Sequence, residues 1–356
     1  LRTKAEPMGD QACLQVIEEE LGSAPQVRFE AFDPSPIAAA SIGQVYKAIY
    51  KGEKVCVKVQ YPGITDATKA DLKNINVILS LVKTLLPKVN AEQMIDDFRM
   101  RLVEECNYQQ EAAYQKQFYE LYREDPDILI PKVVEECSTS RVLTTKYIEG
   151  ESLEVFLQNA TQQERDLAGH TLFRLAFGTL LNHRLFHADP HPGNLLFRCG
   201  PHSKLGLLDF GCVQPINTVA QKDLHLMIRA AIDEQELSGP IERALGVNDI
   251  DDDTKAVCEK ITRMLLAPIL EPQPYRFTLA FAKDIARATI DAKTKMATGF
   301  LLRKRRFSVD REGIMFIVRN LFGLASIWGQ LEAEGLYRET TESILNKLSD
   351  QLELRT

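Results

Sequence analysis

Two short polar motifs, 20 residues apart, constrain this chain more than any other feature. Residues 186–194 have the sequence Phe-His-Ala-Asp-Pro-His-Pro-Gly-Asn, which places Asp189 and Asn194 five positions apart between a helical pattern and an apolar run. Residues 207–211 have the sequence Leu-Leu-Asp-Phe-Gly, an apolar strand pattern that ends at Asp209. Carboxylate and amide oxygens are ligands that Mg²⁺ accepts in proteins. Either motif alone could arise by chance, but both in this order predict a loop and a strand end that hold metal ions.

Two further residues complete the groups that phosphoryl transfer from ATP requires. Lys58 ends the run Val-Cys-Val-Lys, whose apolar residues predict a buried strand with its ammonium directed at nucleotide phosphates. Glu111, 53 residues further on, is the helical carboxylate that we expect to pair with Lys58, and a surface glutamate is the alternative. Asp189 would orient or deprotonate the nucleophile. We therefore predict Asp189, Lys58 and Glu111 as catalytic residues, and Asn194 and Asp209 as ligands of Mg²⁺.

The segment expected to contact the nucleotide is rich in alanine instead of glycine. It comprises Ala38, Ala39, Ala40, Ser41, Ile42, Gly43 and Gln44. A Gly-x-Gly-x-x-Gly loop is absent here, and alanine adopts positive φ only at a cost, so we expect a loop that is stiffer or partly helical. Its backbone N–H groups, Ser41 and Gln44 could still donate to phosphate. With Lys58, this alanine-rich loop is the predicted nucleotide-binding segment.

The stretch after residue 211 bears on the kind of substrate. No Ala-Pro-Glu sequence follows, and a helical pattern resumes within about ten residues. A protein substrate would find little activation segment to dock on, which favours an ATPase or small-molecule kinase over a protein kinase. A nucleotide-binding scaffold without activity is a third alternative, disfavoured because Lys58, Asp189, Asn194 and Asp209 are all present.

Hydrophobic periodicity predicts an α+β fold with two lobes. Strand-type runs occur at 45–50, 54–60, 141–147, 195–197 and 205–208. Helical spacing occurs at 14–21, 66–86, 91–122 and after about residue 218, with polar breaks at 238–240 and 248–253. Thr161 and Glu164 form a capping box that opens a helix reaching about Asn182. We expect a small N-lobe with inserted helices at 1–148 and a helical C-lobe at 149–356.

Charge and cysteine content indicate which classes of partner and which compartment suit this chain. A net charge of −7 and a pI near 5.6 argue against nucleic-acid binding, which needs a basic surface. The basic cluster at 303–306 indicates a solvated helix end, with contact to anionic lipid head groups or an acidic partner as the alternative. Seven cysteines without a Cys-x-x-Cys pair favour a reducing compartment. The apolar stretch at 313–330 contains Arg319 and Asn320, which indicates buried core instead of a membrane span.

Four segments together resemble the UbiB family of atypical kinases. They are Ala-Ala-Ala-Ser-Ile-Gly-Gln at 38–44, Val-Lys-Val-Gln-Tyr-Pro-Gly at 57–63, His-Ala-Asp-Pro-His-Pro-Gly-Asn at 187–194 and Leu-Asp-Phe-Gly at 208–211. The resemblance implies a protein-kinase-like fold with an inserted helical pair in the small lobe. By position it also implies a Lys58–Glu111 ion pair, Asp189 as the catalytic-loop aspartate, and Asn194 and Asp209 as metal ligands.

The same resemblance carries expectations about function. It implies MgATP hydrolysis that supports isoprenoid-quinone (coenzyme Q) or related lipid metabolism at a membrane surface. The implied partners are ATP or ADP, an anionic membrane, and quinone-biosynthesis proteins or a lipid-like precursor. The implied location is peripheral at a membrane, on the bacterial cytoplasmic face or in the mitochondrial matrix or plastid.

Two features depart from the family pattern. The Lys-x-Gly-Gln segment that packs over the active site in this family does not match residues 4–11, and we expect it to precede the start of this sequence. The Glu-x-Asp motif appears as Glu-Cys-Asn at 105–107. Because Asn107 is neutral, we expect a weaker contact with a divalent ion there than a carboxylate would make.

Overall fold

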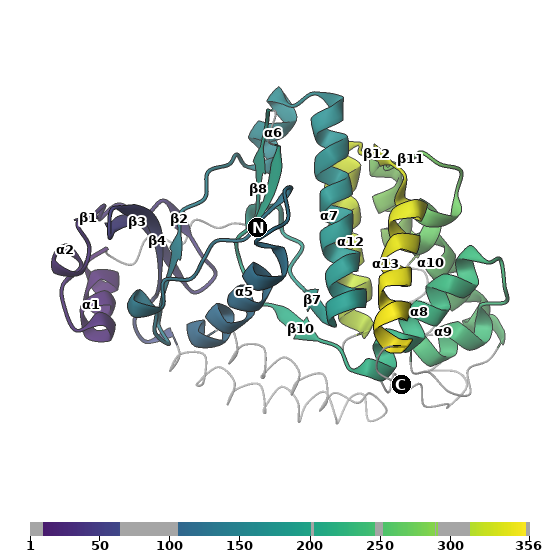
Figure 1. Cartoon of the computed structure of the whole chain (residues 1–356), viewed down its shortest axis with the longest axis horizontal. Coiled ribbons are helices and arrows are strands. Elements are labelled where there is room, and N and C mark those ends of the chain that lie inside the picture. Colours follow the sequence, from purple (N-terminus) through teal and green to yellow (C-terminus); the bar gives the residue numbers. More distant parts are fainter. Residues whose placement is uncertain are drawn as a thin grey trace. The chain divides into compact units, whose positions relative to one another are not determined.

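The computed structural model describes residues 10–64, 106–200, 203–245, 252–288, 290 and 314–353. These residues divide into two compact units. The sheet unit lies within Leu1–Asp125, Leu129–Glu149 and Leu207–Cys212, and the helical unit lies within Pro126–Ile128, Gly150–Gly206 and Val213–Thr356. One carries an antiparallel sheet and the other is mainly helical, which is the predicted α+β, kinase-like class (Figure 1). The expected lobe boundary after residue 148 stays a prediction.

The sheet unit is built on an antiparallel sheet. Its strands are β1 (Ala31–Phe32), β2 (Ala38–Ala39), β3 (Gly43–Tyr50), β4 (Glu53–Gln60) and β6 (Val142–Lys146). The order is β1-β3-β4-β6, and β2 pairs with the half of β3 that β1 leaves open. Lys51 and Gly52 have φ of 50° and 76°, the pair of positive angles that a two-residue hairpin turn requires. The hairpin predicted at 45–60 is therefore confirmed.

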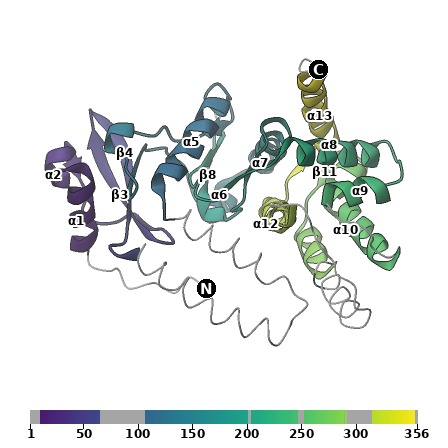
Figure 2. The ribbon, with the colours of Figure 1, turned by 90° about the horizontal axis from the view of Figure 1, so that it is seen from below.

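The two faces of this sheet are covered by different helices. Figure 2 shows α1 (Asp10–Leu21) and α2 (Pro25–Arg28) on one side of β3 and β4, and α5 (Tyr108–Tyr122) on the other. On the α1 side, Cys13 and Ile17 pack with the valines of β4 and with Tyr46. On the α5 side, Tyr108 and Ala112 pack with Val133 and Leu143. Because side chains alternate along a strand, Lys58 faces α5 while the valines beside it face α1.

The start of α5 explains Asn107. Its Oδ1 accepts a hydrogen bond from the backbone N–H of Gln109 at 3.1 Å, which makes Asn107 the N-cap of this helix. The part of the 91–122 periodicity that the structure describes thus forms a helix beginning at Tyr108. The expected helix at 66–86, residues 91–105 and Glu105 of the altered motif lie outside the described residues.

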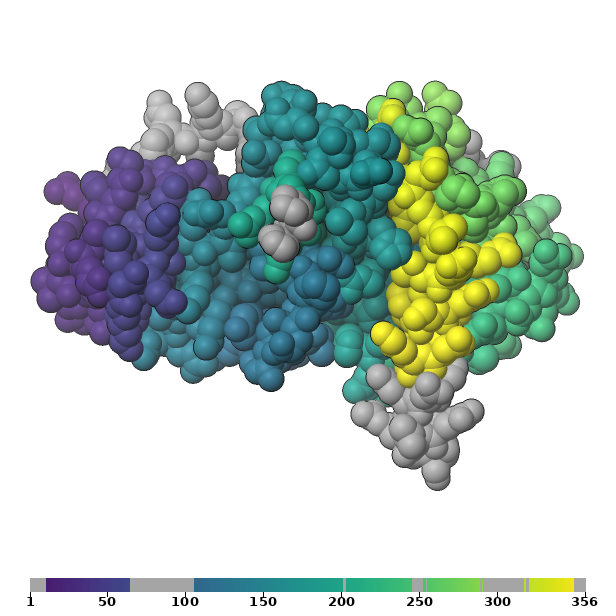
Figure 3. Space-filling model, turned by 45° about the horizontal axis from the view of Figure 1, so that its top comes forward, coloured from purple at the N-terminus to yellow at the C-terminus, as the bar shows by residue number. Residues whose placement is uncertain are grey.

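The helical unit follows the predicted order with additions. Its helices are α6 (Leu153–Asn159), α7 (Gln162–His183), α8 (Thr218–Ile232), α9 (Ser238–Leu245), α10 (Asp252–Leu270), α12 (Ile314–Leu331) and α13 (Tyr337–Glu353). The short strands are β5 (Ile128–Leu129), β7 (Leu185–His187), β8 (Leu195–Arg198), β9 (Lys204–Leu207), β10 (Val213–Pro215), β11 (Tyr275–Arg276) and β12 (Glu334–Gly335). The capping box of Thr161 and Glu164 opens α7 as predicted. Figure 3 shows α13 at the surface beside α7, with which it is in contact.

The helical unit differs from the sequence predictions in two places. The predicted polar break at 238–240 is wrong in part, because these residues form the first turn of α9, where Pro240 is tolerated. The pairing of β11 with β12 was not predicted, since two-residue strands leave little periodicity. The basic cluster at 303–306 and residues 248–251 lie outside the described residues. Within the described part of the chain, no helix is both long and apolar enough to cross a bilayer.

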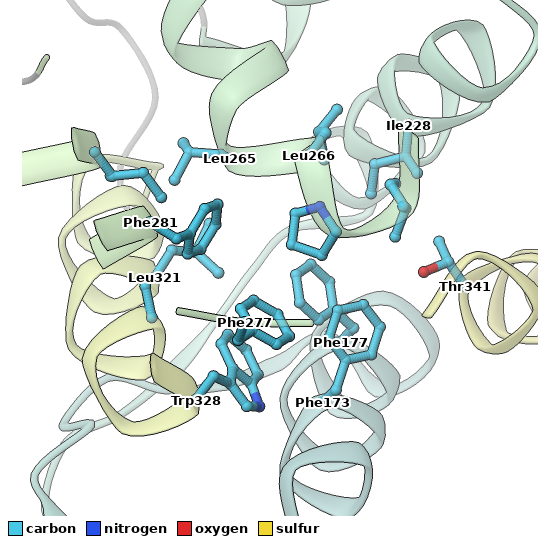
Figure 4. A pocket seen from close by; sticks show the side chains of 14 residues that line it. Phe173, Phe177, Ile228, Leu265, Leu266, Phe277, Phe281, Leu321, Trp328 and Thr341 are labelled. Carbon is cyan, nitrogen blue, oxygen red and sulfur yellow. The ribbon is translucent and has the colours of Figure 1, made fainter. Parts of the chain in front are cut away.

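The core of the helical unit is aromatic. Phe173 of α7 stacks on Phe177 with ring centroids 4.4 Å apart, and Trp328 of α12 stacks on Phe277 at 5.0 Å. Figure 4 shows these rings around a pocket of about 410 Å³, a space that is partly open to solvent. Trp328 Nε1 donates to the carbonyl of Gly169 in α7 at 2.9 Å. Trp328 also packs against Phe173 with ring centroids 5.7 Å apart, so helix α12 is anchored to α7 by ring packing and by a buried hydrogen bond.

Candidate functional site

Lys58 and Glu111, predicted as a pair, are in contact. Lys58 Nζ lies 2.7 Å from Oε1 and 2.9 Å from Oε2 of Glu111. The lysine side chain is 16% exposed and the glutamate side chain 4%, so the pair is largely out of water. Strand β4 presents Lys58 to the α5 face, and the first turn of α5 presents Glu111 to the sheet. A buried charge is tolerated when it is paired in this way.

Asp209 also contacts Lys58. Asp209 was predicted as a metal ligand, but its contact with Lys58 was not predicted from the sequence. Its Oδ2 lies 3.2 Å from Lys58 Nζ, and its Oδ1 accepts a hydrogen bond from the backbone N–H of Gly211 at 2.9 Å. The Asp209 side chain is 36% exposed, far more than that of Glu111. Lys58 therefore lies between a buried carboxylate and an accessible one. We name Lys58, Glu111 and Asp209 the ion cluster.

The charges of the cluster keep Lys58 protonated. Burial alone would lower the pKa of Lys58, but the carboxylates of Glu111 and Asp209 outweigh that effect and raise the pKa above its usual value. An ammonium that stays charged at neutral pH is suited to bind phosphate oxygens.

Tyr108 is a member of this neighbourhood that sequence reasoning missed. Lys58 Nζ lies 5.0 Å from the centre of the Tyr108 ring, within range of a cation–π interaction. The side chain is 1% exposed, and among the described residues its hydroxyl has no hydrogen-bond partner. Burial raises the pKa of Tyr108, so the hydroxyl stays neutral. The available signal was its spacing of three residues before Glu111, which places both on one face of α5.

The alanine-rich loop is a turn between two strands, and the expectation of partial helix is wrong. Ala38 and Ala39 pair with Val45 and Gln44 across the turn, and the N–H of Ala40 donates to the carbonyl of Gly43 at 2.8 Å. The backbone N–H and C=O groups that a helical turn would use for its hydrogen bonds are paired between strands instead. The predicted stiffness without glycine flexibility is still consistent with this hydrogen-bonded form.

Two residues of this loop have clear placements. The Gln44 side chain is 2% exposed and its Oε1 accepts from the Tyr46 hydroxyl at 2.5 Å, on the face of the sheet opposite Lys58. Its backbone, and not its side chain, is thus what could serve a phosphate. A Cβ on Gly43 would lie 2.1 Å from the carbonyl oxygen of Val59 and 2.9 Å from the Tyr108 hydroxyl, so this position requires glycine.

In the helical unit, the loop between β7 and β8 closes on itself. Asn194 Nδ2 donates to Asp189 Oδ2 at 2.7 Å. The backbone N–H of His191 donates to the carbonyl of Asp189 at 2.8 Å, and that of Asn194 donates to the carbonyl of His191 at 2.9 Å. The spacing of five residues in the sequence thus becomes a direct contact. We name residues 187–194 the carboxylate–amide loop.

The donor sets fit a magnesium nucleotide. Asp209, Asp189 and Asn194 offer oxygen atoms, which Mg²⁺ prefers over nitrogen or sulfur. Lys58 offers a charged ammonium, which suits phosphate oxygens. The residues predicted from the sequence therefore have the chemistry required, within the sheet unit for Lys58, Glu111 and Asp209 and within the helical unit for Asp189 and Asn194.

Comparison with known proteins bears on this arrangement. The model of the ABC1 atypical kinase-like domain matches residues 1–238. The chain belongs to the ABC1 atypical kinase-like family. This is the family, with its COQ8 and UbiB members, that the sequence motifs resembled.

Several curated relatives of this ABC1-family chain carry the word mitochondrial or chloroplastic in their names. It is 38% identical over 208 residues to Protein ACTIVITY OF BC1 COMPLEX KINASE 3, chloroplastic, of Arabidopsis thaliana, covering 57% of this chain and 29% of that protein. It is 34% identical to Atypical kinase COQ8B, mitochondrial, of Rattus norvegicus, covering 65% and 44%. Atypical kinase COQ8, mitochondrial, of Schizosaccharomyces pombe is 27% identical, covering 98% and 57%. The ABC1-family chain thus spans from 29% to 57% of the length of these relatives.

A solved structure supports the fold. The complex of Rv3197 with erythromycin from Mycobacterium tuberculosis matches with a TM-score of 0.77 and 27% identity, covering 96% of this chain and 84% of that one. The match extends well beyond residue 238, where the ABC1 domain model ends.

Proposed function

We propose that this ABC1-family chain uses MgATP as an atypical kinase or ATPase. The observation that carries the proposal is the ion cluster, in which Lys58 contacts Glu111, 53 residues away, and Asp209, 151 residues away. Buried charges are costly unless paired, so a cluster of three charged groups indicates a chemical requirement more than a structural one.

Each group has a proposed role. Lys58 binds phosphate oxygens and Glu111 holds Lys58 in place. Asp209 and Asn194 each offer an oxygen ligand to Mg²⁺, which would supply positive charge to the phosphate oxygens when bound. Asp189 orients the attacking nucleophile and accepts its proton. The backbone of the alanine-rich loop, residues 38–44, donates to phosphate.

The proposed substrate is a small molecule of isoprenoid-quinone or related lipid metabolism, met at a membrane surface. The support is that relatives carry the names of mitochondrial COQ8 and chloroplastic BC1-complex kinases, and that the Rv3197 structure is a complex with erythromycin. Only a few residues separate Gly211 from Thr218, where α8 begins, so little chain is present on which a protein substrate could dock. Protein phosphorylation is therefore the second candidate.

The test is nucleotide binding and turnover measured together. We expect MgATP to raise the melting temperature of the full chain and phosphate to be released, the latter faster with anionic vesicles or a phenolic quinone-precursor mimic. Asp209→Asn should abolish the magnesium-dependent part of the shift, whereas Asp233→Asn, at an exposed position of the helical unit, should change nothing. Absence of any MgATP effect on the parent chain would sink the proposal, and binding without turnover would favour a scaffold.

A further inference from the structure

Helix α12 begins 76 residues after the end of the ABC1 domain match at residue 238, yet it contacts the carboxylate–amide loop. We propose that α12 holds this loop in its working position through Asn320 and Gly323, which are positioning residues for Asp189 and Asn194. The inference rests on the proposed function for what the loop does, while the contacts themselves are independent of it.

Asn320 contacts the start of the loop. Its Nδ2 donates a hydrogen bond to the carbonyl of His187, the last residue of β7. The side chain is 1% exposed, and within the described part of the chain its Oδ1 has no hydrogen-bond partner. A buried acceptor without a partner costs stability, and a leucine would avoid that cost. A leucine would also leave the His187 carbonyl without this donor, so the amide at position 320 is explained by its contact with the start of the loop.

Gly323 contacts the loop on the other side of Asp189. A Cβ built on Gly323 would lie 2.3 Å from Cγ and 3.0 Å from Cβ of Pro190, and 3.3 Å from the Pro190 carbonyl oxygen. The proline ring cannot rotate away as a flexible side chain would, because it is closed on the backbone. The absence of a side chain at position 323 thus lets the helix backbone support Pro190 directly.

Together the two contacts flank Asp189 at positions 187 and 190. Helix α12 is itself fixed by the Trp328 hydrogen bond to Gly169 and by stacking on Phe277, so it can act as a rigid support. Catalytic groups must be held within fractions of an ångström, and a misplacement of about 1 Å costs roughly a hundredfold in rate. The consequence is that a helix outside the ABC1 domain match sets the geometry on which turnover depends.

The chain offers a matched pair of variants on one helix. Gly329, also in α12, is packed against backbone as well, since a Cβ there would lie 2.8 Å from the carbonyl oxygen of Thr278, which is not part of the carboxylate–amide loop. Gly323→Ala and Gly329→Ala are the same chemical change in the same helix and both strain a packed contact. We expect Gly323→Ala to lower kcat for ATP hydrolysis about 10- to 100-fold and Gly329→Ala to leave it unchanged, even if both lower the melting temperature.

A second pair of variants and a second measurement distinguish a local effect on the loop from general misfolding. Asn320→Leu removes the hydrogen bond to His187, and Gln330→Leu removes an amide of α12 that donates only within its own helix among the contacts described, to Ser326. Amide hydrogen exchange of the peptide spanning 187–195 should rise in Gly323→Ala and Asn320→Leu and not in the two controls. The inference is overturned if each test variant behaves like its control in both turnover and exchange. A parent chain without turnover defeats the proposed function, and the exchange measurement still decides the positioning role.

Discussion

The ion cluster and the carboxylate–amide loop are built in opposite ways. Lys58, Glu111 and Asp209 come from three distant segments and are held together by charge, largely out of water. Asp189 and Asn194 come from one loop and are held together by short-range hydrogen bonds. Breaking the first arrangement should therefore destabilise its unit, because it leaves a buried charge without a partner, whereas we expect changes in the second to have little effect on folding. The following predictions separate these two kinds of construction.

Removing the cation of the cluster should have the largest effect on stability. Lys58→Met leaves Glu111 buried beside Asp209 without a counter-ion, and breaking a buried pair in this way costs about 3–5 kcal/mol in the free energy of unfolding. Urea denaturation measures the loss. The double variant Lys58→Met/Glu111→Gln should recover much of it, because it removes the unpaired charge.

The control lies in the same sheet. Lys146 pairs with Glu53 at 2.6 Å, but both side chains are well exposed, so Lys146→Met should cost about 1 kcal/mol or less. Equal losses in Lys58→Met and Lys146→Met would contradict the view that burial makes the ion cluster structurally important.

The carboxylate–amide loop should respond in rate rather than stability. Asp189→Asn keeps an oxygen that can accept from Asn194 but removes the charge and the base, so ATP turnover should fall about 10²- to 10⁴-fold. The free energy of unfolding should change by less than about 1 kcal/mol. Turnover and urea denaturation on the same preparation test both halves, and a large stability loss would show that the loop is not the locally closed element described.

Two substitutions of Tyr108 distinguish the contribution of its ring from that of its hydroxyl. Since the buried hydroxyl has no partner among the described residues, Tyr108→Phe should leave the free energy of unfolding unchanged or slightly higher. Tyr108→Leu loses the ring beside Lys58 and should cost about 1–2 kcal/mol. A stable Tyr108→Phe protein with weakened MgATP affinity would show that the hydroxyl serves the nucleotide.

Mild acid should lower the stability of the helical unit, and this is the smallest of the predicted effects. All six histidines of the chain lie between residues 170 and 225, a stretch that belongs to the helical unit except for residues 207–212. Burial lowers the pKa of His170, His183 and His225, so the unfolded chain binds more protons than the folded one below the usual value of about 6.5. Stability should be unaffected by these groups above that pH and fall progressively below it.

Thermal unfolding between pH 7.5 and 5.5 measures this effect. Replacing His183 and His225 by Gln should flatten the dependence, because their protonation would no longer be linked to unfolding. A decline of the same steepness in the double variant would assign the pH dependence to other groups.

Sequence reasoning named candidate residues from their type and spacing, and their roles stay predictions. Lys58, Glu111, Asp189, Asn194 and Asp209 were all named from motifs, and the hairpin and the capping box followed from local rules. It missed contacts between distant segments that no motif carries. Nothing in the pattern at 313–330 indicated that Asn320 would meet His187, 133 residues earlier, because an amide in an apolar helix is read as an interruption.

The prediction of partial helix in the alanine-rich loop was wrong for a related reason. Helix propensity favours alanine locally, and three consecutive alanines predicted some helix. The pairing of Ala38 and Ala39 with β3 overrides that preference, because tertiary strand pairing satisfies the backbone groups more completely. Propensity describes an isolated segment, and this segment has a strand beside it.

The edges of the sheet have a consequence for how the protein behaves in concentrated solution. The outer side of β3 is covered by two short strands, β1 and β2, with Pro34 and Pro36 between them, and neither proline can donate a hydrogen bond to another chain. At the opposite side, the N–H groups of Val134 and Lys146 join residues 132–134 to β6. Open strand edges recruit other chains into aggregates. By covering one edge with a broken strand and the other with a returning segment, this sheet removes the template along which copies of the chain would otherwise associate.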